Sequence, residues 1–476
     1  MSEIICREQE LALFQETLKS NKAELVAVIG RRRVGKTFII REFYKKECVF
    51  EFAGIFESDL QTHMQQFSKS LSTYFYNNVE LEVPKNWFKA FDLLEKSCDA
   101  IRSKKKKVIF LDELPWMATS KSNFKSAFGN FWNNWASKRN DIILIITGSS
   151  TSWMYNEVFL DKGGLYQRVT RKLFIEPFTL KETEKFLKYK KVIFNKSAIL
   201  ELYLSIGGIP FYLDLVKSGE SVPQLIDRLF FKKNAELRSE FDELFKSLFG
   251  DSEIHKDVVK LLAKHLYGLS RTEITTTLKV QSSGNFTKLL DELDKCGFLS
   301  AYIPFGKLSK DKIYKLTDPF TLFHLKFINE NQGLNKWEKI SKSQQWISWS
   351  GLAFENTCFQ HIECIKEKLR IGGIYSTISS WRHKGDDTMK GVQIDMLIDR
   401  DDKIINLCEI KYYSNLVVVT SDLAKQIRMK MTSFAYFTKS KKSIFPILIA
   451  PYGMQENEHS QGLIQNVVEL DDLFKL

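Results

Sequence analysis

The chain has 476 residues, 44% hydrophobic and 27% charged, which is typical of a globular protein with about three domains. Its net charge of +12 is compatible with a nucleic-acid partner but does not identify one. No apolar run approaches the roughly 20 residues of a membrane span, and the polar, acidic start carries no signal-peptide pattern. Scattered cysteines without a C-x-x-C pair exclude a disulfide framework or a zinc site of that type. We therefore expect a cytoplasmic protein with no membrane partner.

The first informative segment is a glycine-rich loop between an apolar run at 25–29 and the start of a helix. It fits G-x-x-x-x-G-K-[ST], in which backbone N–H groups and a helix N-terminus cradle a nucleotide phosphate. Lys36 is expected to reach the β- and γ-phosphates of ATP, and the Thr37 hydroxyl to bind Mg²⁺. The nucleotide-binding residues predicted here are Gly30, Arg31, Arg32, Arg33, Val34, Gly35, Lys36, Thr37 and Phe38.

A second apolar strand, at 107–111, ends in two carboxylates. Asp112 is expected to hold Mg²⁺ beside the nucleotide, and Glu113 to activate the attacking water as general base. A third strand, at 142–146, precedes Thr147 and Ser149, either of which would sense the γ-phosphate if it is not part of a simple turn. Arg168, ahead of a short strand, would touch the γ-phosphate from within the chain or from a neighbour, unless it is an ordinary surface arginine.

The alternation of strands and helices to about residue 180 predicts an α/β, doubly wound P-loop domain with a parallel sheet. A helical lid is expected at about 181–239, which makes 1–239 the ATPase domain. Three helices and a hairpin in 240–335 match a winged helix, with a capping box at Ser270 and Glu273. The hairpin carries the lysines Lys307, Lys310, Lys312 and Lys315. A DNA reader and a domain-packing module are equally consistent with this segment.

The last segment, 336–476, opens with a polar linker holding Trp337, Trp346 and Trp349, followed by a helix from about residue 352. A hairpin then places Asp395 in one strand and Glu409 with Lys411 at the end of the next. Two carboxylates and a lysine that converge can hold Mg²⁺ or Mn²⁺ and activate water for phosphodiester cleavage. Glu355 in the preceding helix would be a third metal ligand. The alternative is a set of edge-strand charges.

Several segments together resemble the archaeal-type ATPase family, a branch of the AAA+/STAND P-loop ATPases of archaea and bacteria that carries a C-terminal PD-(D/E)XK nuclease-like domain. The resemblance rests on residues 30–37, 111–116, 147–150, 207–210, 316–320, 351–355 and 408–411. It implies a restriction-endonuclease-like α/β domain at the C-terminus, nucleotide hydrolysis and a DNA-linked role such as defence against foreign DNA. The chain departs from the family at Gln167, where glycine is usual, and at Gln393, where a carboxylate is frequent.

The sequence thus predicts a Mg²⁺-dependent ATPase joined through a winged helix to a nucleic-acid-binding, DNA-cleaving domain. One rival is a STAND-like signalling ATPase whose C-terminal domain only binds DNA or protein. A second rival, a DNA translocase, is disfavoured because no helicase motif accompanies the two nucleotide motifs. The sequence leaves open whether the chain forms a homo-oligomer or answers to a protein trigger.

Overall fold

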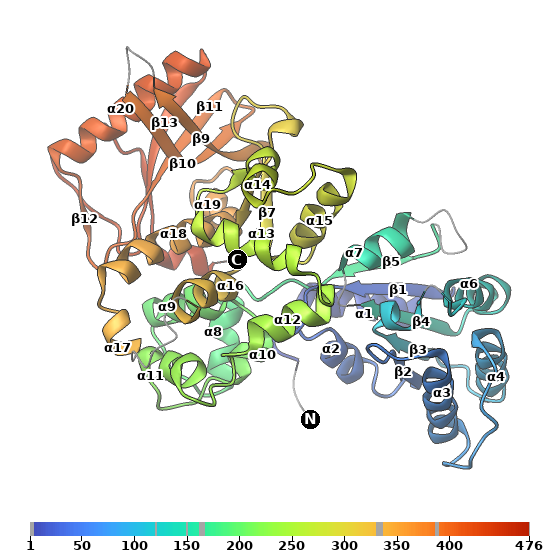
Figure 1. Cartoon of the computed structure of the whole chain (residues 1–476). Helices are drawn as coiled ribbons and strands as arrows, with labels where there is room; N and C mark the ends of the chain where they lie inside the picture. Colours follow the sequence, from blue (N-terminus) through green and yellow to red (C-terminus); the bar gives the residue numbers. More distant parts are fainter. Residues whose placement is uncertain are drawn as a thin grey trace. The chain divides into compact units, whose positions relative to one another are not determined.

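The computed structural model describes residues 4–119, 121–148, 151–160, 167–329, 337–385 and 390–475 (Figure 1). The chain divides into two compact units, Met1–Pro177 and Phe178–Leu476, which are taken separately below. Among the described residues, no helix combines the length and apolar character needed to cross a bilayer.

The first unit is built on a five-stranded sheet in the order β2-β3-β4-β1-β5, in which every neighbouring pair is parallel. Its strands are β1 (Glu24–Ile29), β2 (Cys48–Ala53), β3 (Lys107–Asp112), β4 (Ile142–Gly148) and β5 (Arg171–Phe174). All residues of β1, β3 and β4 are buried, as expected for apolar strands covered on both faces. The predicted parallel α/β domain is confirmed.

Helices surround this sheet (Figure 1), and many of the buried side chains of this core are aromatic. They are α1 (Glu8–Lys19), α2 (Lys36–Phe43), α3 (Leu60–Phe75), α4 (Trp87–Asp99), α5 (Leu114–Met117), α6 (Phe124–Asn134) and α7 (Thr151–Met154), with the short helices η1 (Ala136–Lys138) and η2 (Tyr155–Leu160). Trp87 of α4 lies 4.9 Å, between ring centroids, from Phe124 of α6, and both are buried. This packing fixes the strands and therefore the loops at their ends.

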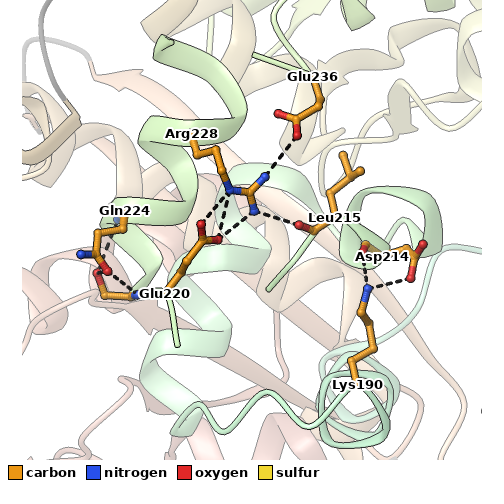
Figure 2. A network of polar contacts seen from close by, with 8 residues as sticks. Lys190, Asp214, Leu215, Glu220, Gln224, Arg228 and Glu236 are labelled. Carbon is orange, nitrogen blue, oxygen red and sulfur yellow. Dashed lines mark hydrogen bonds and ion pairs between the residues drawn. The ribbon is translucent and has the colours of Figure 1, made fainter. Parts of the chain in front are cut away.

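The second unit begins with short helices that match the helical pattern expected at 181–239. They are α8 (Leu180–Tyr189), α9 (Lys196–Ile206), α10 (Pro210–Asp214), α11 (Val222–Ile226), η3 (Asp227–Phe231) and α12 (Glu240–Phe249). The Arg228 guanidinium binds both carboxylate oxygens of Glu220 at 2.8 Å and reaches the Leu215 carbonyl at 2.9 Å (Figure 2). Such two-pronged contacts hold the loops between these helices in place.

Three helices and a three-stranded sheet follow, with the elements α13 (Glu253–Lys264), β6 (Leu269–Ser270), α14 (Arg271–Leu278), α15 (Gly284–Lys295), β7 (Leu299–Tyr302), η4 (Ser309–Asp311) and β8 (Ile313–Leu316). The capping box predicted at Ser270 and Glu273 is present at the start of α14. The sheet is antiparallel in the order β6-β8-β7. Strand β6 was not expected, and it makes β8 the central strand.

The predicted polar linker with its tryptophans is wrong. These residues lie in or beside α16 (Pro319–Phe323), η5 (His324–Ile328), α17 (Trp337–Ile340) and α18 (Gln344–Gln360). Trp337, Trp346 and Trp349 are buried and packed on one another and on Phe327. Ser343 caps α18 through a side-chain bond from the Trp346 N–H, so the helix begins well before residue 352.

The C-terminal sheet has the order β15-β13-β11-β10-β9 and mixes parallel with antiparallel pairs. The remaining elements are α19 (Ile362–Lys368), β9 (Ser376–Gly385), β10 (Lys390–Arg400), β11 (Ile404–Ile410), β12 (Val417–Val418), α20 (Ser421–Thr438), β13 (Ser443–Ile449), β14 (Met454–Gln455), β15 (Asn466–Val468) and η6 (Leu470–Phe474). The expected hairpin forms as the antiparallel pair β10 and β11. Helix α20 then links β11 to the parallel strand β13.

Candidate nucleotide and metal sites

The glycine-rich loop lies where β1 ends and α2 begins, so its backbone surrounds the N-terminus of a helix. Gly35 precedes α2 with φ 93°, in the left-handed region that glycine adopts without a Cβ clash. A side chain at Gly30 would lie 2.4 Å from the Ile175 carbonyl oxygen, because the Ile175 N–H bonds Ile29 at 2.7 Å. The motif's first glycine is therefore required by the neighbouring chain after β5 as well as by its own turn.

Lys36 points back into the loop. Its ammonium donates to the carbonyl oxygens of Gly30 at 2.8 Å and Arg31 at 3.1 Å, and the side chain is buried. Arg31 and Val34 are buried, Arg32, Arg33, Gly35 and Thr37 are half-buried, and Phe38 is exposed. A single cation held inside a ring of backbone groups is the arrangement that binds a phosphate chain.

Strand β3 delivers Asp112 to the same edge of the sheet. The Thr37 hydroxyl donates to Asp112 Oδ2 at 2.8 Å, and the Thr147 hydroxyl at the end of β4 donates to Asp112 Oδ1. Thr147 also accepts the backbone N–H of Glu113 at 3.2 Å. A hydroxyl and a carboxylate side by side are ligands that suit Mg²⁺. The fold thus joins the two nucleotide motifs, which are about 75 residues apart in the chain.

Glu113 stands at the turn between β3 and α5 with φ 51°, a left-handed backbone that is uncommon outside glycine. Its N–H is held by Asp112 Oδ1 at 3.1 Å, and its side chain is half-buried. A Cβ on Gly54 would lie 2.6 Å from the Glu113 carbonyl oxygen. The backbone on either side therefore fixes where this carboxylate stands.

Two predicted nucleotide residues are not placed beside the loop. Ser149 lies outside the described residues. Arg168 is exposed on a turn before β5, close to the Thr170 N–H that bonds Leu25 at the start of β1. Because β5 runs parallel to β1, Arg168 lies at the opposite edge of the sheet, about 15 Å of strand from the loop. This placement does not support a contact of Arg168 with the γ-phosphate from within its own chain.

In the second unit, β10 and β11 bring the predicted carboxylates together. The pairing of Met396 with Cys408 puts Asp395 next to Glu409 across the hairpin. Strand β10 is bulged between Ile394 and Leu397 opposite β9, and such bulges re-aim a side chain. Asp395 Oδ2 accepts the Ile410 N–H at 3.4 Å, and Lys411 Nζ lies 2.8 Å from Glu409 Oε1.

Sequence reasoning missed one cation of this cluster. Lys430 of α20 places its Nζ 2.6 Å from Glu409 Oε2, so both oxygens of Glu409, a residue only 3% exposed, are held by lysines. The only signal in the sequence was that Lys430 falls on the helix after the strand, between the apolar Ile427 and Met431. Which lysine of that helix reaches the strand depends on how the helix packs.

The carboxylates of this cluster repel one another, and the neighbouring lysines oppose that repulsion. Burial and the Asp395 carboxylate raise the pKa of Glu355 to about 7. Burial, followed by Glu409, raises the pKa of Asp395. Burial alone would also raise the pKa of Glu409, but Lys430 and Lys411 outweigh it and lower that pKa. Half-buried carboxylates that repel one another favour a cation between them.

No group of three or more His, Cys, Asp or Glu side chains stands at metal-binding geometry in the part of the chain described. At the second site Glu355, Asp395 and Glu409 interact electrostatically but are not closed around one point. The residue types there fit a divalent cation, whereas their present arrangement is not a finished metal cage.

Among the comparisons with known proteins, a family match covers the residues of the first site. Residues 5–216 match the family described as an ATPase domain predominantly from Archaea. An uncharacterized protein of Methanocaldococcus jannaschii is 27% identical over 418 residues, covering 85% of this chain and 87% of that protein. A Walker-type ATPase of Pyrococcus abyssi is 18% identical with a TM-score of 0.49, covering 68% of this chain and 96% of that one.

A shorter match is to a protein described only as an uncharacterized ATP-binding protein. That protein, of the same Methanocaldococcus, is 40% identical over 43 residues, covering 9% of this chain and 73% of that protein. The P-loop at the end of β1 and the carboxylate at the end of β3 both lie within the residues that match the ATPase family. Residues 5–216 are therefore similar to this family of ATPase domains.

Proposed function

We propose that the protein is a Mg²⁺-dependent ATP hydrolase, coupled through a winged helix to a C-terminal domain that binds nucleic acid, DNA in the first place, and cleaves it. The observation that carries the ATPase part is the meeting of Lys36, Thr37 and Asp112 at one edge of the parallel sheet. Defence against foreign DNA is the role that such a combination suits.

In the ATPase site the chain supplies binding and orientation. The loop N–H groups and the Lys36 ammonium hold the phosphates, while Thr37 and Asp112 would hold Mg²⁺. When bound, that ion neutralises charge that develops on the phosphate oxygens. Glu113 accepts a proton from the attacking water. The hydrogen bond from its N–H to Asp112 holds the backbone that carries this carboxylate.

Replacing Glu113 with glutamine should slow ATP turnover by about 10²- to 10⁴-fold, the range that a general base contributes. ATP binding should persist, because Lys36 and the loop are untouched. Binding measured by calorimetry beside hydrolysis measured by phosphate release tests both halves. Turnover at the parent rate would remove Glu113 from the role of base.

The segment from α13 to β8 is proposed to be a winged helix that meets nucleic acid with its hairpin loop. Support comes from the order of three helices and an antiparallel sheet, and from exposed Lys307 and Lys310 between β7 and β8. Lys315 does not share this role in the present conformation, since it is 9% exposed in the central strand. Phosphate contact would give affinity without sequence preference.

Neutralising Lys310 and Lys312 together with glutamine should weaken DNA binding for all sequences alike. The slope of log affinity against log salt should shrink by roughly one unit for each lost phosphate contact. A double change at Lys232 and Lys233, exposed lysines elsewhere in the same unit, serves as the control. An unchanged slope in fluorescence-anisotropy titrations would assign the hairpin to domain packing instead.

The C-terminal site is proposed to cleave phosphodiester bonds. Asp395, Glu409 and Glu355 would hold Mg²⁺ or Mn²⁺, and Lys411 would orient the attacking water or stabilise charge on the phosphate. The convergence of these side chains on the β10–β11 hairpin, with the electrostatic strain among the carboxylates, supports this assignment.

A specific observation favours the rival, a signalling ATPase whose C-terminal domain only binds a partner. Each oxygen of the Glu409 carboxylate already lies beside a lysine ammonium, Lys411 at one oxygen and Lys430 at the other. A Mg²⁺ or Mn²⁺ cleavage assay on several nucleic acids, with and without ATP, separates the two. If the chain assembles as a homo-oligomer, Arg168 remains a candidate to reach a neighbour's γ-phosphate.

A further inference from the structure

The residues that cover the proposed cleavage site come from another part of the second unit. Lys315 occupies the central strand of the sheet β6-β8-β7, yet only 9% of it is exposed. Strands have two faces, and on β8 the buried Tyr314 and Leu316 flank Lys315 on the opposite face. Something must therefore cover the face on which Lys315 lies.

Contacts identify the cover as the C-terminal sheet and α18. The Asn356 side-chain amide, next to Glu355, donates to the Leu316 carbonyl at 3.3 Å, and Gln360 donates to the Thr317 carbonyl at 3.2 Å. The Phe305 N–H bonds the Ser380 carbonyl of β9 at 3.2 Å, and the Phe305 ring lies 4.9 Å from Phe434 of α20. The sheet is thus fastened to three elements around the site.

The tyrosines beside the sheet close the same region. The Tyr302 hydroxyl donates to the Tyr267 backbone carbonyl at 3.2 Å, and burial, followed by the charges of Glu355 and Asp395, raises the pKa of Tyr267. The charges of Glu355 and Asp395 both act on Lys315. Lys315 is thereby a third lysine facing the carboxylate cluster, and it comes from outside the β10–β11 hairpin.

We propose that the sheet β6-β8-β7 is a lid on the carboxylate site, with the Lys315 ammonium standing in for a divalent cation until the lid moves away. This inference rests on the proposed function of the site, whose regulation it describes. While Phe305, Tyr302 and Lys315 are docked, they cover one side of the carboxylate cluster, and their departure would widen the access of a phosphodiester to Asp395 and Glu409. Cation and lysine compete for the same carboxylates, and each therefore weakens the other.

The first test measures Mn²⁺ binding to the nucleotide-free full-length protein by electron paramagnetic resonance. Binding that disappears in Asp395→Ala defines the C-terminal site. In Lys315→Met, which keeps the length of the side chain but not its charge, that site should bind Mn²⁺ at least about fivefold more tightly. Lys288→Met, an exposed lysine of α15 in the same module, should leave the affinity unchanged.

The outcomes separate the lid from the site. If no Mn²⁺ binding depends on Asp395 in either the parent or Lys315→Met, the site itself fails. If such binding exists but Lys315→Met leaves it unchanged or weakens it, the lid proposal is overturned, and a weakening would make Lys315 part of the working site.

A second variant tests movement. The double variant Phe305→Cys, Ser380→Cys places a cysteine on each of two segments whose backbones are hydrogen bonded to each other. Residues at that separation are within the usual reach of a disulfide. The oxidised protein should lose Mn²⁺-dependent cleavage of plasmid DNA by at least tenfold and recover it when reduced. Since the reduced form is the same polypeptide, a folding defect cannot mimic that recovery. Undiminished cleavage by the fully cross-linked protein would overturn the lid.

Discussion

Replacing Lys36 with alanine should reduce ATP hydrolysis by at least about 10²- to 10³-fold, the usual cost of losing one donor to a transition-state charge. Its ammonium is buried and is held by the Gly30 and Arg31 carbonyls at the centre of the loop. Without it, the loop N–H groups would remain, but the ammonium that neutralises charge on the phosphates would be lost. The measurement is steady-state phosphate release with ATP binding followed in parallel.

Lys46→Ala is the matched control, since Lys46 is exposed just after α2 and in the same unit. It should hydrolyse ATP at the parent rate. Turnover by Lys36→Ala at the parent rate would show that this loop does not carry the activity. If nucleotide also acts as a switch on the C-terminal domain, Lys36→Ala should change cleavage as well, because a ligand shifts only states that bind it differently.

Replacing Asp395 or Glu409 with alanine should abolish metal-dependent cleavage of DNA. One carboxylate alone does not fix a divalent cation, and Asp395→Ala also removes the acceptor of the Ile410 N–H. Lys411→Ala should lower the cleavage rate while metal binding largely persists. ATP hydrolysis should survive all three changes, because the phosphate-binding loop belongs to the other compact unit.

Plasmid nicking and Mn²⁺ binding measured on the same preparations provide the readout. Glu363→Ala, on the exposed side of α19, is the control for loss of a carboxylate without effect on the hairpin. Cleavage that continues unaffected in Asp395→Ala would remove the nuclease assignment and leave the binding-only rival.

Features that depend on residues close together in the chain could be predicted from the sequence. The phosphate-binding loop needs two glycines, a lysine and a threonine within eight residues, and that density of constraint identifies it from letters alone. The strand ending at Asp112 and the capping box at Ser270 are equally short-range, and the structure has both. The parallel sheet followed from strand and helix alternation, since parallel strands require such crossovers.

Contacts between residues far apart in the chain could not be predicted from the sequence. The sequence pattern around Trp346 and Trp349 predicts a linker, because the partners Phe323 and Phe327 lie some twenty residues earlier in the chain. Only the packing of the helices brings these rings together. Arg168 was a candidate for the γ-phosphate until strand direction put it at the far edge of the sheet. Strand β6 has only two residues and no period to detect.

The sequence by itself determined the phosphate-binding-loop motif and which carboxylates belong to the hairpin, because spacing within a strand or turn is fixed by backbone geometry. Only the tertiary structure decided that Thr147 joins Thr37 on Asp112, that Lys430 holds Glu409, and that Lys315 is buried in the central strand of its sheet. Those contacts join residues distant in the chain. Their formation depends on how whole elements pack, which no local pattern encodes.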